Sequence, residues 1–384
     1  MDKNKKGFQS AESYRTWIEI NKNAVKNNYG IFREIVEPST KLWAVVKSNA
    51  YGHGLSVFSR LINEFGVDGF CVDSLLEGLK LRKDKIHKPI LVLGPTLYNL
   101  FDLAWKKKIT LTVSNFESLK ELGRLKLKPK FHIKIDTGMS RQGFLMEDVP
   151  RVINLIKKSE LNLAQSFSGI YTHFASAKDV NYPTYTELQF DSFKKISNLF
   201  ERAGFENLEK HVAATGATLI DKKYHLDAVR VGIGLYGLWP SKELEIQLAS
   251  AIKLQPILSW RTLVSEVKNI KQGSFIGYDL VEKTDRPIKI AVLPFGYWHG
   301  FPRNLSGIGE ILIKGKRCRV LGRVSMDLIV IDVTGVDAQV GDYATIIGMD
   351  LKESILASEI SSKIQASYYE FVTRLNPLIK RVVV

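Results

Sequence analysis

The chain has 384 residues, of which 45% are hydrophobic and 25% charged, as in an ordinary folded globular protein. This composition excludes a disordered, collagen-like or disulfide-stapled chain. The formal net charge of +15 raises nucleic acid or an acidic membrane surface as partners. The basic residues are spread evenly along the chain rather than gathered in an arm or tail, so we expect no nucleic-acid partner.

Targeting and redox signals point to a cytoplasmic protein. The first residues contain no apolar segment of the kind found in signal peptides, and no run of apolar residues is long enough to span a membrane. The two cysteines, Cys71 and Cys318, lie far apart and have no neighbouring Cys or His at metal-binding spacing. We therefore expect a reducing compartment, no membrane partner and no metal site.

Between residues 40 and 237, short runs rich in Val, Ile and Phe alternate with longer amphipathic runs. The predicted strands are Leu42–Val46, Gly69–Val72, Ile90–Leu93, Thr110–Val113, Phe131–Ile135, Gly169–His173, His211–Ala213 and Ala228–Val231. The predicted helices between them are Leu55–Phe65, Leu75–Lys83, Leu100–Lys106, Phe116–Leu122, Val149–Lys157, Thr186–Ala203 and Ala217–Lys222.

Such alternation favours parallel strands joined by helical crossovers. Eight units of this kind predict an α/β fold of the (β/α)₈ barrel type over residues 14–245. A doubly wound open sheet is the alternative, because both folds bury continuous apolar strands.

The pattern changes after residue 250. Apolar runs follow one another through short turns that contain glycine, and the next long helical pattern is at Leu351–Arg374. This predicts a mainly β domain over residues 246–384, with which residues 1–13 are expected to associate.

In a (β/α)₈ barrel, functional residues gather where strands end, and phosphate often binds after the seventh and eighth strands. Lys47 directly follows the first predicted strand, and an amine held there can form a Schiff base with a carbonyl. His173 and Arg230 lie at the ends of the sixth and eighth strands, so their side chains could meet. Each of these residues taken alone is more often an ordinary solvated or core residue.

Residues Gly232–Gly237 form a literal GxGxxG pattern. A dinucleotide site would need a helix opening there and an acidic residue about twenty positions further on, and Pro240 and the absence of such an acid argue against it. A simpler phosphate site remains open, formed by Thr215 and the loop at Gly232.

Several segments together resemble the alanine racemase family of pyridoxal-phosphate enzymes. Residues 44–54 (AVVKSNAYGHG) resemble the family's cofactor-lysine signature. The supporting segments are KIDTGMSRQGF at 134–144, GIYTHFA at 169–175, VRVGIGLYG at 229–237, GRVSMD at 322–327 and Tyr369-Glu370. They run in family order along nearly the whole chain.

The resemblance implies a barrel, a β domain and a homodimer whose active sites are shared between subunits. Lys47 would hold pyridoxal 5′-phosphate covalently. The phosphate would be bound by Tyr51, Thr215, Gly232, Ile233 and Tyr369.

Further roles follow from the same resemblance. Arg230 would face the pyridine nitrogen of the cofactor, with His173 behind it. Arg141 and the backbone of Met326 would bind the substrate carboxylate. Lys134 matches a position that is carbamylated in some members.

The implied reaction is a two-base interconversion of L- and D-alanine that supplies D-alanine for peptidoglycan. Lys47 would serve one face of the substrate Cα atom, and Tyr278 of the other subunit would serve the opposite face. Without the resemblance, Tyr278 would be read as a turn tyrosine.

The chain departs from the family pattern in three places. Ala214–Thr215 replaces Asn-Ser, and Ser325 stands where Cys is common. The usual Gly-Tyr-Ala-Asp-Gly is Gly296–Gly300 here, with Trp298 and His299 as the new residues. The last change alters the expected substrate entrance, so strict specificity for alanine is not predicted.

Three alternatives are weighed against alanine racemisation. A broad-specificity or serine/lysine racemase would use the same scaffold, and a pyridoxal-phosphate amino-acid decarboxylase would use a related barrel. The decarboxylase would not require a second base at Tyr278. A basic binding protein without enzymatic activity would leave the residues around Lys47 unexplained.

Overall fold

The computed structural model describes residues 14–179 and 181–384. The described residues form two compact units. The barrel unit holds residues 23–50 and 58–256, and the β unit holds residues 14–22, 51–57 and 257–384. Within the described residues, no helix is both long and apolar enough to cross a membrane.

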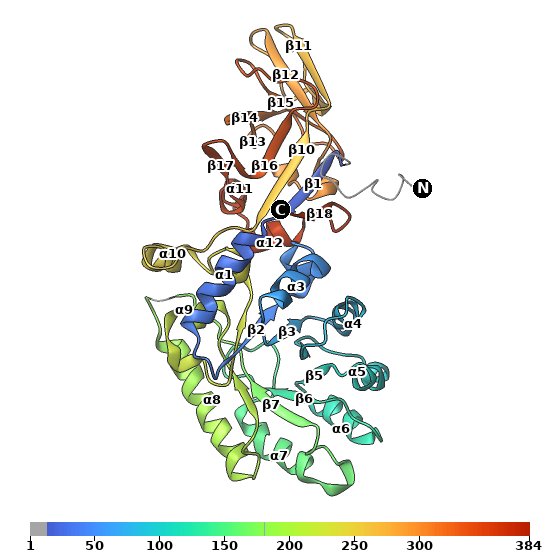
Figure 1. Cartoon of the computed structure of the whole chain (residues 1–384), viewed down its shortest axis with the longest axis vertical. Helices are drawn as coiled ribbons and strands as arrows, with labels where there is room; N and C mark the ends of the chain where they lie inside the picture. The colour runs from blue at the N-terminus through green and yellow to red at the C-terminus, as the bar shows by residue number, and fades with distance from the viewer. Residues whose placement is uncertain (1–13, 180) are drawn as a thin grey trace, which may run out of the picture. The chain divides into compact units, whose positions relative to one another are not determined.

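The barrel unit is built on a parallel sheet (Figure 1). In the part of the chain that the structure describes, its eight strands lie in the order β8-β7-β6-β5-β4-β3-β2-β9. A parallel bridge between Ala214 and Arg230 connects the segments of β8 and β9 and closes the sheet. The strands are β2 (Lys41–Val45), β3 (Gly69–Val72), β4 (Ile90–Val92), β5 (Thr110–Val113), β6 (Phe131–Lys134), β7 (Phe167–Tyr171), β8 (Glu209–His211) and β9 (Ala228–Val231). This confirms the predicted (β/α)₈ type of fold.

The segments between the strands form helices because their apolar residues recur at helical spacing and can be buried on one face. In α7 (Val149–Lys157), Val149, Val152, Ile153 and Ile156 are buried on one face. The strands lie between these helices and the barrel interior, and every residue of β3, β6 and β9 is buried. The other helices are α1 (Lys22–Ile35), α3 (Leu55–Glu64), α4 (Leu75–Lys83), α5 (Phe101–Lys106), α6 (Phe116–Arg124), α8 (Thr184–Arg202), α9 (Thr215–Ile220) and α10 (Lys242–Leu248). The short segment α2 (Lys47–Tyr51) has left-handed rather than helical backbone at Ser48, Asn49 and Ala50.

The β unit is mainly β, as predicted, but it recruits both ends of the described chain. β1 (Thr16–Ile20) pairs antiparallel with β10 (Leu258–Leu263) and parallel with β18 (Lys380–Val383). The other strands are β11 (Glu266–Ile270), β12 (Ile288–Leu293), β13 (Glu310–Ile313), β14 (Lys316–Leu321), β15 (Ile329–Asp332), β16 (Tyr343–Asp350) and β17 (Glu353–Ile355).

The two compact units divide the chain differently from the predicted domains in three segments, one of which is residues 246–256, which belong to the barrel unit. Residues 14–22 and 51–57 belong to the β unit, although we expected the barrel domain to run from 14 to 245. The segment 351–374, predicted as helical, contains β17 followed by α11 (Ala357–Lys363) and α12 (Tyr368–Thr373). The expectation for residues 1–13 lies outside the described residues.

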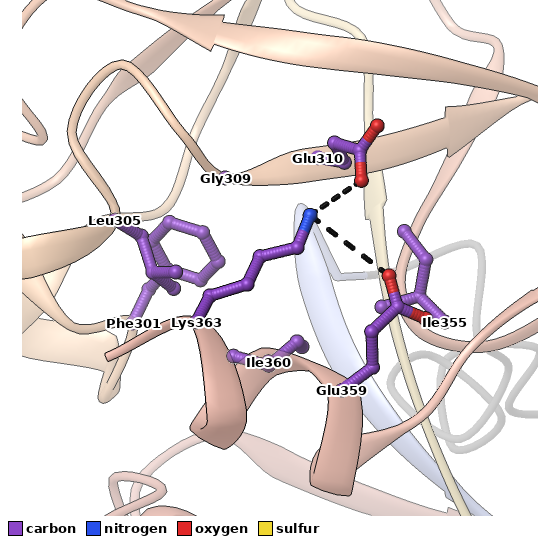
Figure 2. A pocket seen from close by; sticks show the side chains of 8 residues that line it. All are labelled: Phe301, Leu305, Gly309, Glu310, Ile355, Glu359, Ile360 and Lys363. Atoms are coloured by element: carbon purple, nitrogen blue, oxygen red, sulfur yellow. Dashed lines mark hydrogen bonds and ion pairs between the residues drawn. The ribbon is translucent and has the colours of Figure 1, made fainter. Parts of the chain in front are cut away.

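A small hollow in the β unit is lined by Phe301, Leu305, Ile355 and Ile360 together with charged groups (Figure 2). Lys363 of α11 forms ion pairs with Glu310 of β13 at 2.5 Å and with Glu359 at 3.9 Å. Because both acids neutralise the charge of the lysine, we interpret these ion pairs as structural contacts that hold α11 against the sheet.

Candidate active site

Lys47 stands at the start of an unusual turn. It is half-buried, and the four residues after it, Ser48 to Tyr51, have φ angles between 50° and 56°. Left-handed backbone costs about 1–2 kcal/mol for each residue that is not glycine. The turn is held by hydrogen bonds from the Ala50 N–H to the Val46 carbonyl at 2.9 Å and from the Asn49 N–H to Glu77 Oε1 at 3.2 Å. Backbone strain of this kind is typical of functional sites. Here it determines the direction of the backbone directly after Lys47.

Lys47 belongs to a group of basic side chains in the barrel unit. Lys47, Arg141 and Arg230 all act on Lys134, whose side chain is buried in β6. Burial and these positive charges lower the pKa of the Lys134 amine to about 7, and Asp136 opposes the shift. Among residues 14–179 and 181–384, none of these four basic side chains forms an ion pair with a carboxylate. The group therefore carries positive charge that the protein itself does not neutralise.

Arg230 of β9 is buried and is held by the strand ends beside it. Its Nη1 donates to the His211 carbonyl at 2.9 Å, and its Nη2 donates to the carbonyls of Thr172 at 2.8 Å and Val212 at 3.2 Å. A buried guanidinium requires such acceptors because it cannot lose its proton. Carbonyls rather than carboxylates supply them, so the charge of Arg230 stays available to a ligand.

The histidine bonded to Arg230 is His211, not His173, which we expected behind it. Arg230 Nη1 lies 2.5 Å from His211 Nδ1. His173 follows β7 and is half-buried. Burial and then the positive charges of Arg230 and Lys134 lower the pKa of His173 well below its ordinary value, so its imidazole is neutral at pH 7.

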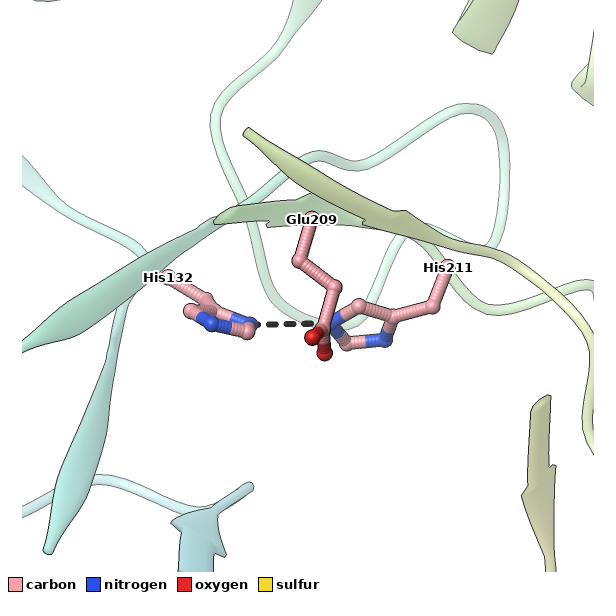
Figure 3. A group of neighbouring side chains, drawn as sticks. All are labelled: His132, Glu209 and His211. Atoms are coloured by element: carbon pink, nitrogen blue, oxygen red, sulfur yellow. Dashed lines mark hydrogen bonds between the residues drawn. The ribbon is translucent and has the colours of Figure 1, made fainter. Parts of the chain in front are cut away.

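A second histidine, His132, lies beside His211 (Figure 3). His211 Nε2 lies 2.8 Å from Nδ1 of His132 on β6. Since arginine can only donate, His211 Nδ1 accepts, and a neutral His211 then carries its proton on Nε2 and donates to His132. We call this arrangement the histidine chain, Arg230–His211–His132.

Glu209 lies beside the histidine chain, so the three side chains in Figure 3 resemble a set of metal ligands. One ligand atom from each residue lies within 4.8 Å of the others. However, both ring nitrogens of His211 already take part in hydrogen bonds. Glu209 forms an ion pair with Lys41. We therefore interpret the two histidines as a support for Arg230 rather than as metal ligands.

The histidine chain predicts a dependence of stability on pH. Burial and then the charges of Lys41 and Arg230 lower the pKa of His132 to about 3. The unfolded chain binds this proton near pH ~6.5. The stabilisation is therefore complete above that pH and is lost as the pH falls towards 3.

Urea denaturation at several pH values between these limits measures the effect. We expect His132→Gln to remove a slope of about 1.4 kcal/mol per pH unit from the unfolding free energy. The control, His87→Gln, changes an exposed histidine and should leave the slope unchanged. An unchanged slope in His132→Gln would show that His132 is protonated in the native protein.

Arg141 stands on a loop that Asp136 organises after β6. The Asp136 carboxylate accepts hydrogen bonds from the N–H groups of Gly138 at 2.9 Å, Ser140 at 3.1 Å and Arg141 at 2.9 Å. Burial raises the pKa of Asp136, but these bonds outweigh it and the net shift is downward. The backbone of the loop is thus fixed while the Arg141 side chain remains exposed.

Thr215 connects the loops after β8 and β9, the two places where phosphate was expected. Its Oγ1 accepts hydrogen bonds from the N–H groups of Gly232 at 3.0 Å and Gly234 at 3.5 Å. Gly234 must be glycine, because a Cβ atom there would lie 2.4 Å from the ring of Phe32. Ile233 follows Gly232 in the same turn and is buried. Thr215, which replaces the serine usual in the family, therefore provides a hydroxyl group that accepts hydrogen bonds at this position.

The remaining predicted site residues lie in the β unit. The rings of Tyr51 and Tyr369 have centroids 6.3 Å apart. Tyr278 begins a short 3₁₀ helix, Tyr278–Leu280, and 68% of its surface is exposed. Met326 is 51% exposed, and its carbonyl accepts from the Trp298 N–H at 3.1 Å.

In the segment Gly296–Gly300, which departs from the family pattern at two residues, one of the two, His299, has a clear structural role. His299 is buried, and its Nδ1 accepts a hydrogen bond from the Gly296 N–H at 3.2 Å. Burial and then the charge of Arg15 lower the pKa of His299, which keeps it a neutral acceptor. It therefore closes the turn, while Trp298 stays 45% exposed.

Sequence reasoning missed two residues of the site. His211 was placed in a strand without a role, and its contact with Arg230 depends on the closure of the barrel between β8 and β9. Asp136 entered only as part of the segment at 134–144 that supports the resemblance, without a role of its own. An aspartate can accept hydrogen bonds from N–H groups a few residues further along a turn, and the sequence after Asp136 offered this signal at spacings of two, four and five residues.

Known families and structures match the chain along most of its length. The family described as "Alanine racemase, N-terminal domain" matches residues 20–240, and "Alanine racemase, C-terminal domain" matches residues 257–383. Alanine racemase of Leptospira interrogans is 36% identical over 385 residues, with 97% of each chain covered. Alanine racemase of Methanococcus maripaludis is 38% identical, with 96% of this chain and 99% of that protein covered.

Solved structures agree with these sequence matches. Alanine racemase from Bacillus anthracis with bound L-Ala-P has a TM-score of 0.90 and 32% identity, covering 96% of this chain and 95% of that chain. Alanine racemase from E. faecalis has a TM-score of 0.88 and 29% identity, covering 98% and 100%. The chain therefore belongs to the alanine racemase family of isomerases.

Proposed function

We propose that this protein interconverts L- and D-alanine with pyridoxal 5′-phosphate as its cofactor. The observation that carries this proposal is the group of Lys47, Lys134, Arg141 and Arg230, which shares no ion pair with a carboxylate in the described part of the chain. A cofactor phosphate and a substrate carboxylate would supply the missing negative charge.

The residues present fit this cofactor. Lys47 would bind it covalently, and Thr215, Gly232, Ile233, Tyr51 and Tyr369 would bind its phosphate. When bound, pyridoxal phosphate supplies a carbonyl that condenses with amines and a conjugated ring that accepts the electrons of the Cα–H bond.

Arg230 would face the ring nitrogen. Since an arginine cannot give up its proton, that nitrogen would remain unprotonated. A less electron-withdrawing ring favours return of the proton to Cα over side reactions such as transamination. The histidine chain would hold the guanidinium in place, and His173 would contribute a neutral imidazole nearby.

Racemisation requires the Cα proton to leave from one face and return on the other. Lys47 would exchange the proton on one face, and Tyr278 would exchange it on the opposite face. Tyr278 and Met326 are exposed on the β unit, which supports a homodimer in which each subunit supplies these residues to its partner. The substrate carboxylate would be bound by Arg141 and the Met326 backbone.

The substrate is a small amino acid, and L-alanine is the one that the family favours. D-alanine formed here would serve as a precursor for peptidoglycan. The exposed Trp298 at the altered segment favours testing serine and lysine as further substrates.

Lys134 is suited to carbamylation. Only the neutral amine adds to CO₂, with release of one proton, and a pKa of about 7 makes the neutral form abundant above pH 7. The product is an anion that would pair with Arg141. We expect a carbamate ¹³C signal with labelled bicarbonate at pH ~8 and its loss at pH ~6, as the amine becomes protonated.

Lys134→Ala should lack this signal, whereas Lys130→Ala, which changes an exposed lysine, should keep it. A signal that persists in Lys134→Ala would assign the carbamate to another group.

Borohydride reduction tests the cofactor directly. We expect the purified protein to bind pyridoxal phosphate with a visible absorption band that borohydride abolishes, and peptide mapping to find the reduced adduct on Lys47. An adduct on other lysines alone, or none after incubation with the cofactor, would contradict the proposal.

A further inference from the structure

Arg381 on β18 uses its whole guanidinium within the β unit. Its side chain is buried and donates to Gly52 from Nε at 3.2 Å and from Nη2 at 2.7 Å. Nη1 donates to the carbonyls of Asn376 and Ile379, both at 2.6 Å, and Nη2 also donates to Leu375 at 3.3 Å. These five bonds match the five N–H donors of a guanidinium. All the acceptors are backbone carbonyls, so Arg381 fixes the path of the chain.

The bonds of Arg381 connect two segments that are far apart in the sequence. One is the turn at Gly52–Gly54, and the other is the loop after α12. A Cβ atom on Gly52 would lie 1.8 Å from the Val372 carbonyl, and one on Gly54 would lie 3.2 Å from Arg381 Cγ. The turn therefore lies directly against α12 and the arginine, with no room for side chains between them.

Each of these segments carries one tyrosine. Tyr51 precedes Gly52, and Tyr369 lies in α12, with their ring centroids 6.3 Å apart. Tyr51 also has a φ of 50°, a conformation that the surrounding structure must impose. Arg381 bonds the residue next to Tyr51 and the segment that ends α12.

We infer that Arg381 is a positioning residue that holds Tyr51 and Tyr369 in the arrangement that binds the cofactor phosphate. This inference rests on the proposed function of the two tyrosines. Lysine cannot reproduce this set of bonds, because its ammonium group has three donors and Arg381 makes five bonds.

The test compares the binding of pyridoxal phosphate with that of pyridoxal, which lacks the phosphate. Both are measured by spectroscopic titration of the full-length protein, in the oligomeric state in which it is purified and after its cofactor has been removed. Arg381→Lys should weaken pyridoxal phosphate binding about tenfold or more, as expected for the loss of charged hydrogen bonds. Pyridoxal binding should stay within about twofold of the parent protein. Arg82→Lys is the matched control, because Arg82 on α4 also donates its bonds to backbone carbonyls, and none of its four bonds goes to the segments that carry Tyr51 and Tyr369.

A second arm asks whether the arginine acts through the tyrosines. In Tyr51→Phe/Tyr369→Phe, adding Arg381→Lys should weaken pyridoxal phosphate binding by less than twofold, because the groups to be positioned are already lost. An effect as large as in the parent protein would overturn the inference.

Unchanged binding of both ligands, or equal weakening of both, would overturn the positioning role. If Arg381→Lys does not fold, Arg381→Gln replaces it, and failure of both to fold would overturn the inference by making Arg381 a general stability residue. If the parent protein itself does not bind pyridoxal phosphate, the proposed function fails instead.

Discussion

Replacement of Lys47 by Ala is expected to lower the rate of alanine racemisation about 10²–10⁴-fold or more, because the change removes both the covalent anchor of the cofactor and a proton-transfer group. The melting temperature of the cofactor-free protein should not fall, since Lys47 is half-buried and belongs to a group of like charges. Activity is measured by chiral chromatography, and stability by thermal denaturation.

The matched control is Lys83→Ala, which changes an exposed lysine at the end of α4. Small primary amines added to Lys47→Ala should restore part of the activity by replacing the missing amine. A Lys47→Ala protein with half of the parent activity or more would remove Lys47 from the mechanism.

The second large effect is expected in Tyr278→Phe. Interconversion should fall about 10²–10⁴-fold in both directions, because two mirror-image amino acids are equally stable and the equilibrium constant is unchanged. Exchange of the Cα proton with solvent should survive for one enantiomer only, since Lys47 can still remove and return a proton on its own face. In D₂O, that enantiomer should gain deuterium without inversion.

Mass spectrometry coupled to chiral chromatography measures deuterium and inversion together. Stability should be unaffected, since the Tyr278 side chain is 68% exposed. Tyr343→Phe changes another exposed tyrosine of the β unit and should behave as the parent protein. Deuterium in both enantiomers at the parent rate would exclude Tyr278 as the second base.

The barrel could be predicted because its signal is local. Each strand is a short apolar run, and each helix buries residues at a spacing of three and four, as in α7. The positions of Lys47 and Arg230 at strand ends then followed from the fold class. β1 and β18 could not be predicted in the same way, because Thr16 pairs with Thr262 and Trp17 with Lys380, far along the chain.

Parts of the site were hidden for related reasons. The left-handed turn at Ser48–Tyr51 contains no glycine, so its residues give no sign of positive φ. The contact between His211 and Arg230 arises only when the barrel closes. The resemblance supplied Tyr278 and Met326, whose exposed positions in turns carry no catalytic signal of their own.

The central claim is tested most directly by incubating the purified protein with pyridoxal phosphate and L-alanine, and following both enantiomers by chiral chromatography, with L-serine and L-lysine in parallel. We predict that L-alanine is converted until both enantiomers are equally abundant, and that D-alanine reaches the same mixture. Unchanged L-alanine, in a preparation that carries the reduced cofactor adduct on Lys47 when treated with borohydride, would contradict the account.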